Sequence, residues 1–573
     1  MGTRTRIFVG VLALCLLVVT AGMVAADGGP DTGSTAEPTE ASVDAATLET
    51  FDAADEDLVH ECAETPPDDF ADPPESNDAI GWVDGYWYNE PIDIDASDGL
   101  TRDELAELSA RTAARFEAMR CLPFEEIPRV DVITREEFAE ETADQYADVD
   151  EETRLYDNAQ LATMLLIGTD EDSIDVRQQD RAATVGGYYN FNEKRIVVVS
   201  DNPDELLIDE QILAHELGHA VQDQHFDLAQ YTRDTSDLDR GKLGIIEGDV
   251  HRIEHEYLQY CEQDLWTDEC VTEPIDEEPE APPNWGLYLK EFQPYSDGPS
   301  FAEYVYEEGG WDAVDAVYDD MPETAVEIIY PERYGEFEPA DLDLEDRTGD
   351  EWERLQPDGG PGYNVIGQSG ITAMFVEPAY DQSNPDEFIS QQNFVNFDPV
   401  TGEIDPQNPL NFDQPESNGW AADELHVFRN EANETATIWK TAWEDDAEGD
   451  RFARTYDELV ESRGGERVDG YAHTYEFDAD TGFEMALTLV PEGDRVWIQT
   501  APTVDDLTDV DTDLELVDAD ASRIAEQDDD GEEDDGADNG DDDDDPIPGF
   551  GVVAAVIASL VAGLGLARRL DRV

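Results

Sequence analysis

Residues 212–228 read ILAHELGHAVQDQHFDL, and the interpretation of the whole chain starts from this stretch. His215 and His219 are one helical turn apart, so on a helix the two imidazoles point the same way and can bind one metal ion. Glu216 follows the first histidine and can reach a water molecule on that ion as general base. The HExxH spacing therefore predicts a zinc centre with ligands His215 and His219 and catalytic Glu216.

Histidine is concentrated around this motif. Five of the eight histidines lie within 41 residues, where uniform scatter would place fewer than one. They are His215, His219, His225, His251 and His255. Histidines that merely occupy a solvated acidic helix face would not gather in this way, so the concentration favours a metal site.

A catalytic zinc needs a third protein ligand and one open position. His225 stands where the pattern HExxHxxGxxH places its third histidine, but Gln222 replaces the glycine that lets the chain turn sharply. Glu247 lies 28 residues after His219, on a second predicted helix. The departure at Gln222 favours Glu247 as the third ligand, with His225 as the alternative.

Several polar residues near these ligands are candidates for supporting roles. Asp249, His251 and also His225 are predicted to hydrogen-bond the ligands, which fixes the tautomer of a ligating histidine. Donors for the oxyanion of a hydrolytic intermediate are also needed. The candidates are Tyr330, Tyr188 and His251.

The hydrophobic periodicity predicts an α+β fold. Strands are expected at 130–134, 184–189 and 195–199, the last two as a hairpin, and helices at 101–119, 152–166, 203–221 and 242–260. Gly309 to Trp311 is expected to form a turn. Regular segments at 424–428, 437–443 and 496–499 indicate a further small module.

Composition divides the chain into seven segments. They are a signal peptide (1–26), an acidic flexible lead-in (27–75), the catalytic domain (76–375), an irregular connection (376–418), a small α+β module (419–504), an acidic low-complexity spacer (505–547) and a C-terminal sorting signal with a transmembrane segment (548–573).

The charge balance is extreme, with 143 acidic against 32 basic residues and a formal net charge of -111. Such a chain repels polyanions, which argues against nucleic acid as a partner. Molar salt shortens the Debye length to about 3 Å and screens the self-repulsion. The composition is typical of proteins from haloarchaea.

Cysteine and asparagine patterns agree with an exported chain. Cys15 falls within the predicted signal peptide, which leaves four cysteines and three possible disulfide pairings. Cys261 with Cys270 is the short-loop option and leaves Cys62 with Cys121. Asn433 begins an N-glycosylation sequon.

The C-terminal tail resembles the haloarchaeal PGF-type sorting signal that archaeosortase recognises. Pro548-Gly549-Phe550 precedes an apolar run at 551–567 and the basic residues Arg568, Arg569 and Arg572. The resemblance implies removal of the tail and a lipid anchor in its place; a plain membrane anchor is the alternative. In both cases the folded part is expected at the cell surface, bound to the membrane and envelope through this tail.

The motif region resembles a family of exported zinc metallopeptidases of bacteria and archaea. Members pair HExxHAxQDQxFxL with a later EGDA-like helix, here at Glu247 to Val250. Residues 301–318, 322–334 and 419–420 match the family pattern as well. The resemblance implies a zincin-like domain of the gluzincin type, one zinc ion and a peptide or protein substrate. Many members carry histidine where this chain has Tyr330, which puts the oxyanion donor in question.

These observations together predict a surface-anchored zinc metallopeptidase. A non-catalytic metal-binding surface protein, adhesive or structural, is the alternative. The two hypotheses differ in the importance of Glu216, which only the enzyme requires for its function.

Overall fold

The computed structural model describes residues 62–519 apart from short internal gaps. The gaps are 68, 71–72, 75–78, 96–98, 148, 201–205, 207, 264, 268–269, 272–283, 343–347, 358–359, 381–386 and 400. The predicted signal peptide, most of the acidic lead-in and the sorting tail lie outside the described residues. Among the helices described, none combines the length and apolarity that crossing a bilayer requires.

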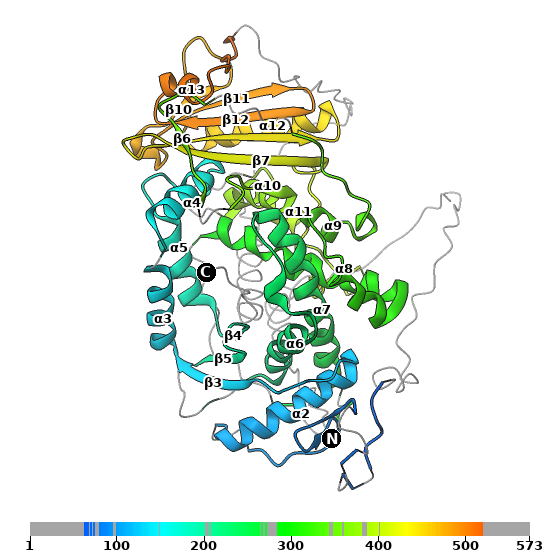
Figure 1. The fold of residues 1–573 in the computed structure, drawn as a ribbon. Helices are drawn as coiled ribbons and strands as arrows, with labels where there is room; N and C mark the ends of the chain where they lie inside the picture. Colours follow the sequence, from blue (N-terminus) through cyan, green and yellow to red (C-terminus); the bar gives the residue numbers. More distant parts are fainter. Residues whose placement is uncertain are drawn as a thin grey trace, which may run out of the picture.

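The chain has a mixed α+β architecture with two main sheets (Figure 1). The smaller sheet has the order β3 (Arg129–Thr134), β5 (Arg195–Ser200), β4 (Gly187–Asn190). β5 is parallel to β3 and antiparallel to β4, so the predicted strand and hairpin are confirmed. β4 is the edge strand of this sheet and, as shown below, contacts the motif helix.

Four helices surround or follow this sheet. They are α2 (Arg102–Arg120), α3 (Arg135–Ala147), α4 (Glu151–Thr163) and α5 (Ser173–Thr184). Thr101 and Glu104 form a capping box that starts α2, as expected where Thr precedes Glu by three residues. The helices predicted at 101–119 and 152–166 are therefore confirmed. A short hairpin of β1 (Trp82–Val83) and β2 (Tyr86–Trp87) lies beside α2.

The motif helix α6 (Glu210–Phe226) begins later than the sequence predicts. The Asp209 side chain accepts a hydrogen bond from the Gln211 amide and caps the helix. The Leu206 carbonyl accepts instead from the Leu100 amide at 2.7 Å, so it is not available to a helical turn. Leu206 and Ile208 are buried but lie before the helix, in backbone that is not helical. Their hydrophobic periodicity alone had placed them in the predicted helix.

Two long helices pack against each other behind α6. α7 (Ser236–Glu262) lies along α8 (Trp285–Val317), with Gly248 against Gly298: a Cβ on Gly248 would lie 2.1 Å from the Gly298 carbonyl oxygen. Inside α8, Gly309 and Gly310 leave helical geometry, with φ of 67° at Gly310. The turn predicted at Gly309 to Trp311 is thus a break within this helical segment.

The larger sheet has seven antiparallel strands and lies at one end of the molecule (Figure 1). Its order is β6 (Glu353–Arg354), β7 (Trp420–Arg429), β8 (Thr435–Trp443), β12 (Arg495–Ala501), β11 (Ala486–Glu492), β10 (Thr474–Glu476), β9 (Glu466–Arg467). α12 (Asp446–Ser462) packs on one face and α13 (Val504–Val510) on the other. The three regular segments predicted for this module are all strands.

Short helices connect these parts. They are α9 (Ala325–Ile329), α10 (Gly367–Val376) and α11 (Gln391–Phe394), with 3-10 turns at Leu228–Gln230, Pro331–Arg333, Glu377–Tyr380 and Ala479–Thr481. Asp423 of β7 accepts from the amides of Ile366 and Gly367 and from two tryptophan indoles, which fastens α10 to the larger sheet.

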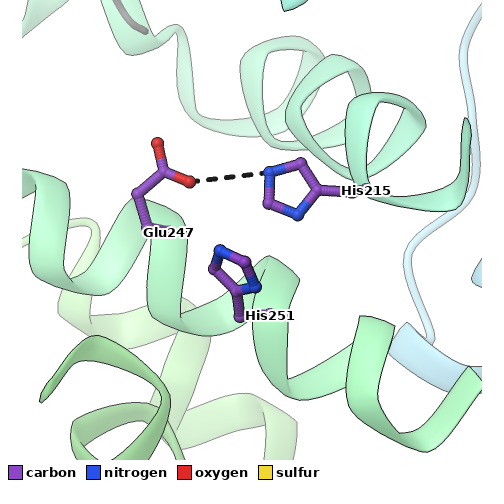
Figure 2. A group of neighbouring side chains, drawn as sticks. All are labelled: His215, Glu247 and His251. Carbon is purple, nitrogen blue, oxygen red and sulfur yellow. Dashed lines mark ion pairs between the residues drawn. The ribbon is translucent and has the colours of Figure 1, made fainter. Parts of the chain in front are cut away.

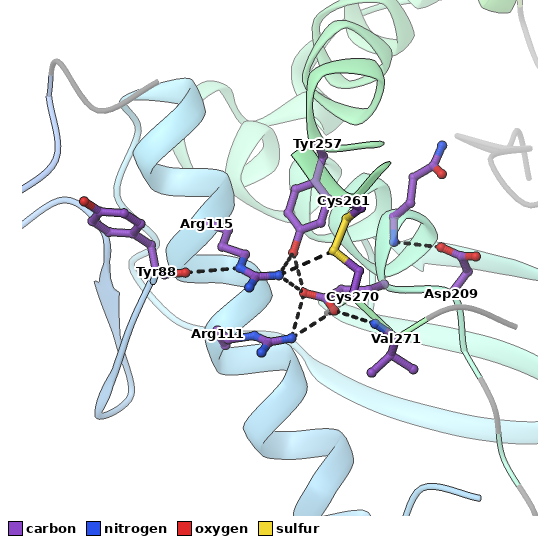
Figure 3. Close-up of a disulfide and its surroundings, with 10 residues drawn as sticks. Tyr88, Arg111, Arg115, Asp209, Tyr257, Cys261, Cys270 and Val271 are labelled. Atoms are coloured by element: carbon purple, nitrogen blue, oxygen red, sulfur yellow. Dashed lines mark hydrogen bonds and ion pairs between the residues drawn. A yellow bond between two sulfur atoms is a disulfide. The ribbon is translucent and has the colours of Figure 1, made fainter. Parts of the chain in front are cut away.

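Two disulfides are present, Cys62–Cys121 and Cys261–Cys270, so the short-loop pairing is the one that forms. The Cys261–Cys270 bridge joins the end of α7 to the segment that meets the start of α6 (Figure 3). Next to it, the buried Glu210 carboxylate accepts from Arg111, Arg115, the Tyr257 hydroxyl and the Val271 amide. This cluster ties α2, α6 and α7 together.

Candidate metal centre

Two imidazole nitrogens of α6 and one carboxylate oxygen of α7 lie close together, next to the edge strand β4. His215 Nε2 and His219 Nε2 of α6 are 3.0 Å apart, and Glu247 Oε2 of α7 is 3.6 Å from the first and 3.4 Å from the second. Figure 2 shows the His215–Glu247 pair. Ligands bound tetrahedrally at about 2.0–2.1 Å lie roughly 3.3 Å from one another. The three atoms therefore have the separations of a metal-ligand set.

The hydrogen bonds of the other ring nitrogens assign the tautomers. His215 Nδ1–H donates to Glu254 Oε2 at 3.0 Å, and His219 Nδ1–H donates to Gln222 Oε1 at 3.0 Å. Gln222 Nε2 donates to the Ile246 carbonyl, so its oxygen is the atom that faces the imidazole. Each Nε2 thus presents a lone pair to the other and to Glu247.

The residues present fit a divalent cation. His215, His219 and Glu247 are all buried, so their lone pairs face one another in an environment of low dielectric constant. Burial lowers the pKa of His215, but Glu247 and Glu254 outweigh it and raise that pKa to about 10. A proton on His215 Nε2 could form a hydrogen bond to only one of the other two atoms, His219 Nε2 or Glu247 Oε2. A metal cation can accept a lone pair from all three atoms at once.

The Glu247 carboxylate is held from its other side. Tyr295 of α8 donates its hydroxyl to Glu247 Oε1 at 3.1 Å, which leaves Oε2 for the two imidazoles. Burial raises the pKa of Glu247, but His219 and His215 lower it to about 2 overall. The sequence offered no signal for Tyr295, because it is 48 residues from Glu247 and on another helix.

Asp249 supports the centre through Gln222 and is not itself part of the trio. Its carboxylate pairs with Arg120 at 2.7 Å and accepts from the Tyr318 hydroxyl at 2.9 Å. Gln222 Nε2 also donates to Tyr318 Oη at 2.8 Å and approaches Asp249 Oδ2 at 3.3 Å. The residue that departs from the third-histidine pattern is therefore the one that orients His219.

His251 lies one turn beyond Glu247, with its ring centroid 4.6 Å from that of His215 (Figure 2). Its Nδ1–H donates to Glu254 Oε2 at 2.7 Å, while its buried Nε2 has no hydrogen-bond partner among the described residues. Burial raises the pKa of Glu254, but His251 and His215 together hold it well below its usual range. His251, His215 and Glu247 offer atoms within 4.8 Å of one another. His251 is thus a neighbour of the centre with a free nitrogen.

Glu216 is buried beside the trio and receives a backbone hydrogen bond from Tyr189 of β4. Its Oε1 has no partner among the described residues. Burial raises the pKa of Glu216 to about 7, with His215 and His219 opposing the rise and Glu247 adding to it. A carboxylate with this pKa suits proton transfer near neutral pH.

Two of the predicted residues lie elsewhere. His225 is exposed, and its Nε2–H donates to the Pro123 carbonyl at 2.7 Å; because Gln222 continues the helix to Phe226, His225 does not turn back toward His219. The Tyr330 hydroxyl is bonded to Asp413 at 2.9 Å and Asn418 at 2.8 Å, and no contact in the described part of the chain joins it to the trio.

The remaining predicted residues are at the periphery. Tyr188 packs with Phe138 and Val197 on the far side of the small sheet. Asn433 is exposed in the turn between β7 and β8, with φ of 63°. Its place in a turn is compatible with a sequon, and its glycosylation stays a prediction.

Comparison with known proteins assigns only the C-terminal part. A family model described as a domain of unknown function (DUF8575) matches residues 353–511, which span the larger sheet and α13. No curated protein and no solved structure matches the chain. The candidate metal centre, at residues 215–254, lies outside the matched region.

Proposed function

We propose that this chain is a zinc-dependent metallopeptidase of the gluzincin type, with a zincin-like domain and a surface location. The observation that carries the proposal is the convergence of His215 Nε2, His219 Nε2 and Glu247 Oε2 within 3.0–3.6 Å beside a buried Glu216. Two imidazoles and one carboxylate are a donor set that zinc accepts in hydrolytic sites.

His215, His219 and Glu247 would hold the ion, which when bound supplies Lewis acidity to a water molecule and a substrate carbonyl. Glu216 accepts the proton of the attacking water at Oε1 and delivers it to the leaving amine. Its buried position keeps this proton from exchanging with bulk water. The Tyr189 amide fixes the carboxylate so that Oε1 stays free.

Three features support a peptide substrate. β4 is an edge strand of the small sheet and lies next to Glu216 through Tyr189, so an extended chain can add to the sheet beside it. His251 is a candidate donor to the oxyanion in its imidazolium form, in which Nδ1–H donates to Glu254 and the buried Nε2–H, close to the trio, has no partner in the described residues. The family resemblance of the motif helix points to the same reaction.

Metal content and hydrolysis test the proposal on full-length protein kept in molar KCl. Elemental analysis should find one zinc per chain in the wild type and none in His219→Ala. Glu216→Gln should keep the zinc and lose about 10²–10⁴-fold of its activity on unfolded protein substrates. Glu136→Gln, an exposed glutamate on α3, is the control and should behave as the wild type.

If the wild-type protein binds no metal after zinc is added, the proposal that it is a zinc-dependent peptidase is refuted. Bound zinc with no hydrolysis, unchanged by Glu216→Gln, would favour the non-catalytic surface protein.

A further inference from the structure

A cavity of about 890 Å³ lies among α4, α5, the first turns of α7 and α8, and the loop at 357–366. Tyr295 lines it, and the hydroxyl of the same tyrosine donates to Glu247 Oε1. The cavity and the metal centre therefore share a side chain.

Charged residues of both signs line this cavity, and four of them are basic although basic residues are rare in the chain, at 32 against 143 acidic residues. The basic residues are Arg177, Arg233, Arg240 and Lys290, and the acidic ones are Asp150, Asp157, Asp234, Asp239 and Glu291. Arg177 pairs with Asp157 and Glu291, and both Arg233 and Arg240 pair with Asp239. Of these groups, Arg240 keeps an unpartnered Nε and Lys290 forms no ion pair among the described residues.

Lys290 is 6% exposed, and its single hydrogen bond runs from Nζ to Ser236 Oγ at 3.0 Å. No carboxylate oxygen of the described residues forms an ion pair with Nζ. Burial, with Arg240 and Arg177 adding their repulsion, lowers the pKa of Lys290 to about 7, although the nearby carboxylates of Glu291 and Asp157 oppose the fall. A buried ammonium without a direct ion pair is costly, and a ligand carboxylate in hydrogen-bond contact would offset that cost.

Arg240 is 9% exposed and stands near Lys290. Its guanidinium donates to Asp239 at 2.9 Å and to the Glu291 carbonyl at 3.2 Å, while its buried Nε has no partner in the described structure. An ammonium and an unsatisfied guanidinium N–H beside one cavity form a receptor for a carboxylate.

The spacing relates this receptor to the metal centre. Arg240 precedes Glu247 by seven residues on α7, so the two lie on one helix face about 10 Å apart along the axis. An extended peptide advances about 3.3 Å per residue. A carboxylate at Lys290 and Arg240 would thus be about two or three residues from a peptide bond at the metal.

We propose that this cavity is a substrate subsite in which Lys290 and Arg240 bind a carboxylate of the peptide. The inference rests on the proposed peptidase function and specifies its substrate class: peptides with an acidic group about two or three residues from the cleaved bond. That group is either an Asp or Glu side chain or the free C-terminus.

The test measures cleavage of internally quenched peptides by full-length protein in molar KCl. Peptides with Asp at successive positions are compared with the same peptides carrying Asn. In addition, peptides with a free C-terminal carboxylate are compared with the same peptides carrying a C-terminal amide. In the wild type, kcat/KM should be about 10- to 100-fold higher for one carboxylate position than for its neutral counterpart. The preferred peptide identifies the source of the carboxylate.

Lys290→Met should abolish this preference, so that the charged peptide and its neutral counterpart are cleaved with equal kcat/KM, and Lys290→Arg should retain most of it. Lys440→Met is the matched control, because Lys440 is also buried but packs on Trp497 in the larger sheet. Its preference should equal that of the wild type.

A binding measurement separates this inference from the peptidase proposal. Calorimetry with Glu216→Gln protein and the preferred peptide should show about tenfold weaker binding of the neutral counterpart even without turnover. Equal kcat/KM for charged and neutral peptides in the wild type overturns the subsite, as does a preference that persists in folded Lys290→Met. Selective binding without hydrolysis would retain the carboxylate receptor and reject the peptidase.

Discussion

Replacing Gln222 with leucine should weaken metal binding without removing any ligand. The Gln222 side chain accepts from His219 Nδ1 at 3.0 Å and donates to the Ile246 carbonyl at 2.9 Å, and it is buried. Leucine has a similar size but makes neither bond. His219 would then lose the acceptor that fixes its tautomer and ring orientation.

The magnitude follows from the group left unpaired. Loss of a partner that orients a ligating histidine typically costs about 10- to 100-fold in metal affinity. One buried polar group, His219 Nδ1–H, would lose its partner at a cost of about 1–3 kcal/mol, whereas the Ile246 carbonyl lies within α7 and keeps its helical hydrogen bond. The free energy of unfolding of the metal-free protein should therefore fall by about 1–3 kcal/mol.

Zinc affinity is measured by competition with a chelator of known strength, and stability by denaturant titration, both in molar KCl. Gln224→Leu is the control, because Gln224 is on the same helix but bonds only to the backbone at Glu125 and Glu126 near the surface. A folded Gln222→Leu protein with the zinc affinity of the wild type would refute the role assigned to this residue.

Three further predictions concern stability. Glu210→Gln leaves two buried arginines without their counter-ion and should lower the free energy of unfolding by about 3–5 kcal/mol; a loss below about 1 kcal/mol in denaturant titrations would contradict the argument. The paired change Cys261→Ser with Cys270→Ser opens a short loop and should cost about 2–3 kcal/mol against oxidised wild type, measured in the same way. Burial raises the pKa of Glu117 from 4.5 to about 7, although two backbone amides donate to its carboxyl group and oppose the rise. The folded state therefore binds this proton more tightly than the unfolded state does, so the contribution of Glu117 to the free energy of unfolding is full below pH 4.5 and is lost as the pH rises toward 7. The stability of wild type minus Glu117→Gln should fall by about 3 kcal/mol over that interval, and a flat difference would show that the carboxyl titrates normally.

Local patterns predicted the regular elements well where one rule decides them. The hairpin of β4 and β5 follows from two runs rich in aromatic and β-branched residues around a polar turn, and the Thr101 capping box marks the start of α2. The start of α6 was misplaced because apolar residues before Asp209 continue the helical spacing. Only the bond from the Leu100 amide to the Leu206 carbonyl removes them from the helix.

The motif itself was readable because its members are close in sequence. His215, Glu216 and His219 lie on one helix, where a spacing of four residues fixes their common face. Glu247 was favoured as the third ligand because Gln222 replaces the glycine that a turn toward His225 would need. Tyr295 and Glu254 carry no motif, and nothing in the chain's periodicity marks them as partners of the ligands.

The sequence alone determined an acidic chain with an HExxH helix, its paired histidines, its catalytic carboxylate candidate, the strands of the smaller sheet and three strands of the larger one, because these depend on neighbours a few residues apart. Tertiary structure decided which carboxylate meets the histidines, which groups orient them, and that Lys290 is buried beside a cavity without a direct ion pair among the described residues. Such pairings depend on how closely whole helices approach. At Gly248 and Gly298 the packing of α7 on α8 requires that neither residue carry a side chain, and this contact helps bring Tyr295 to Glu247.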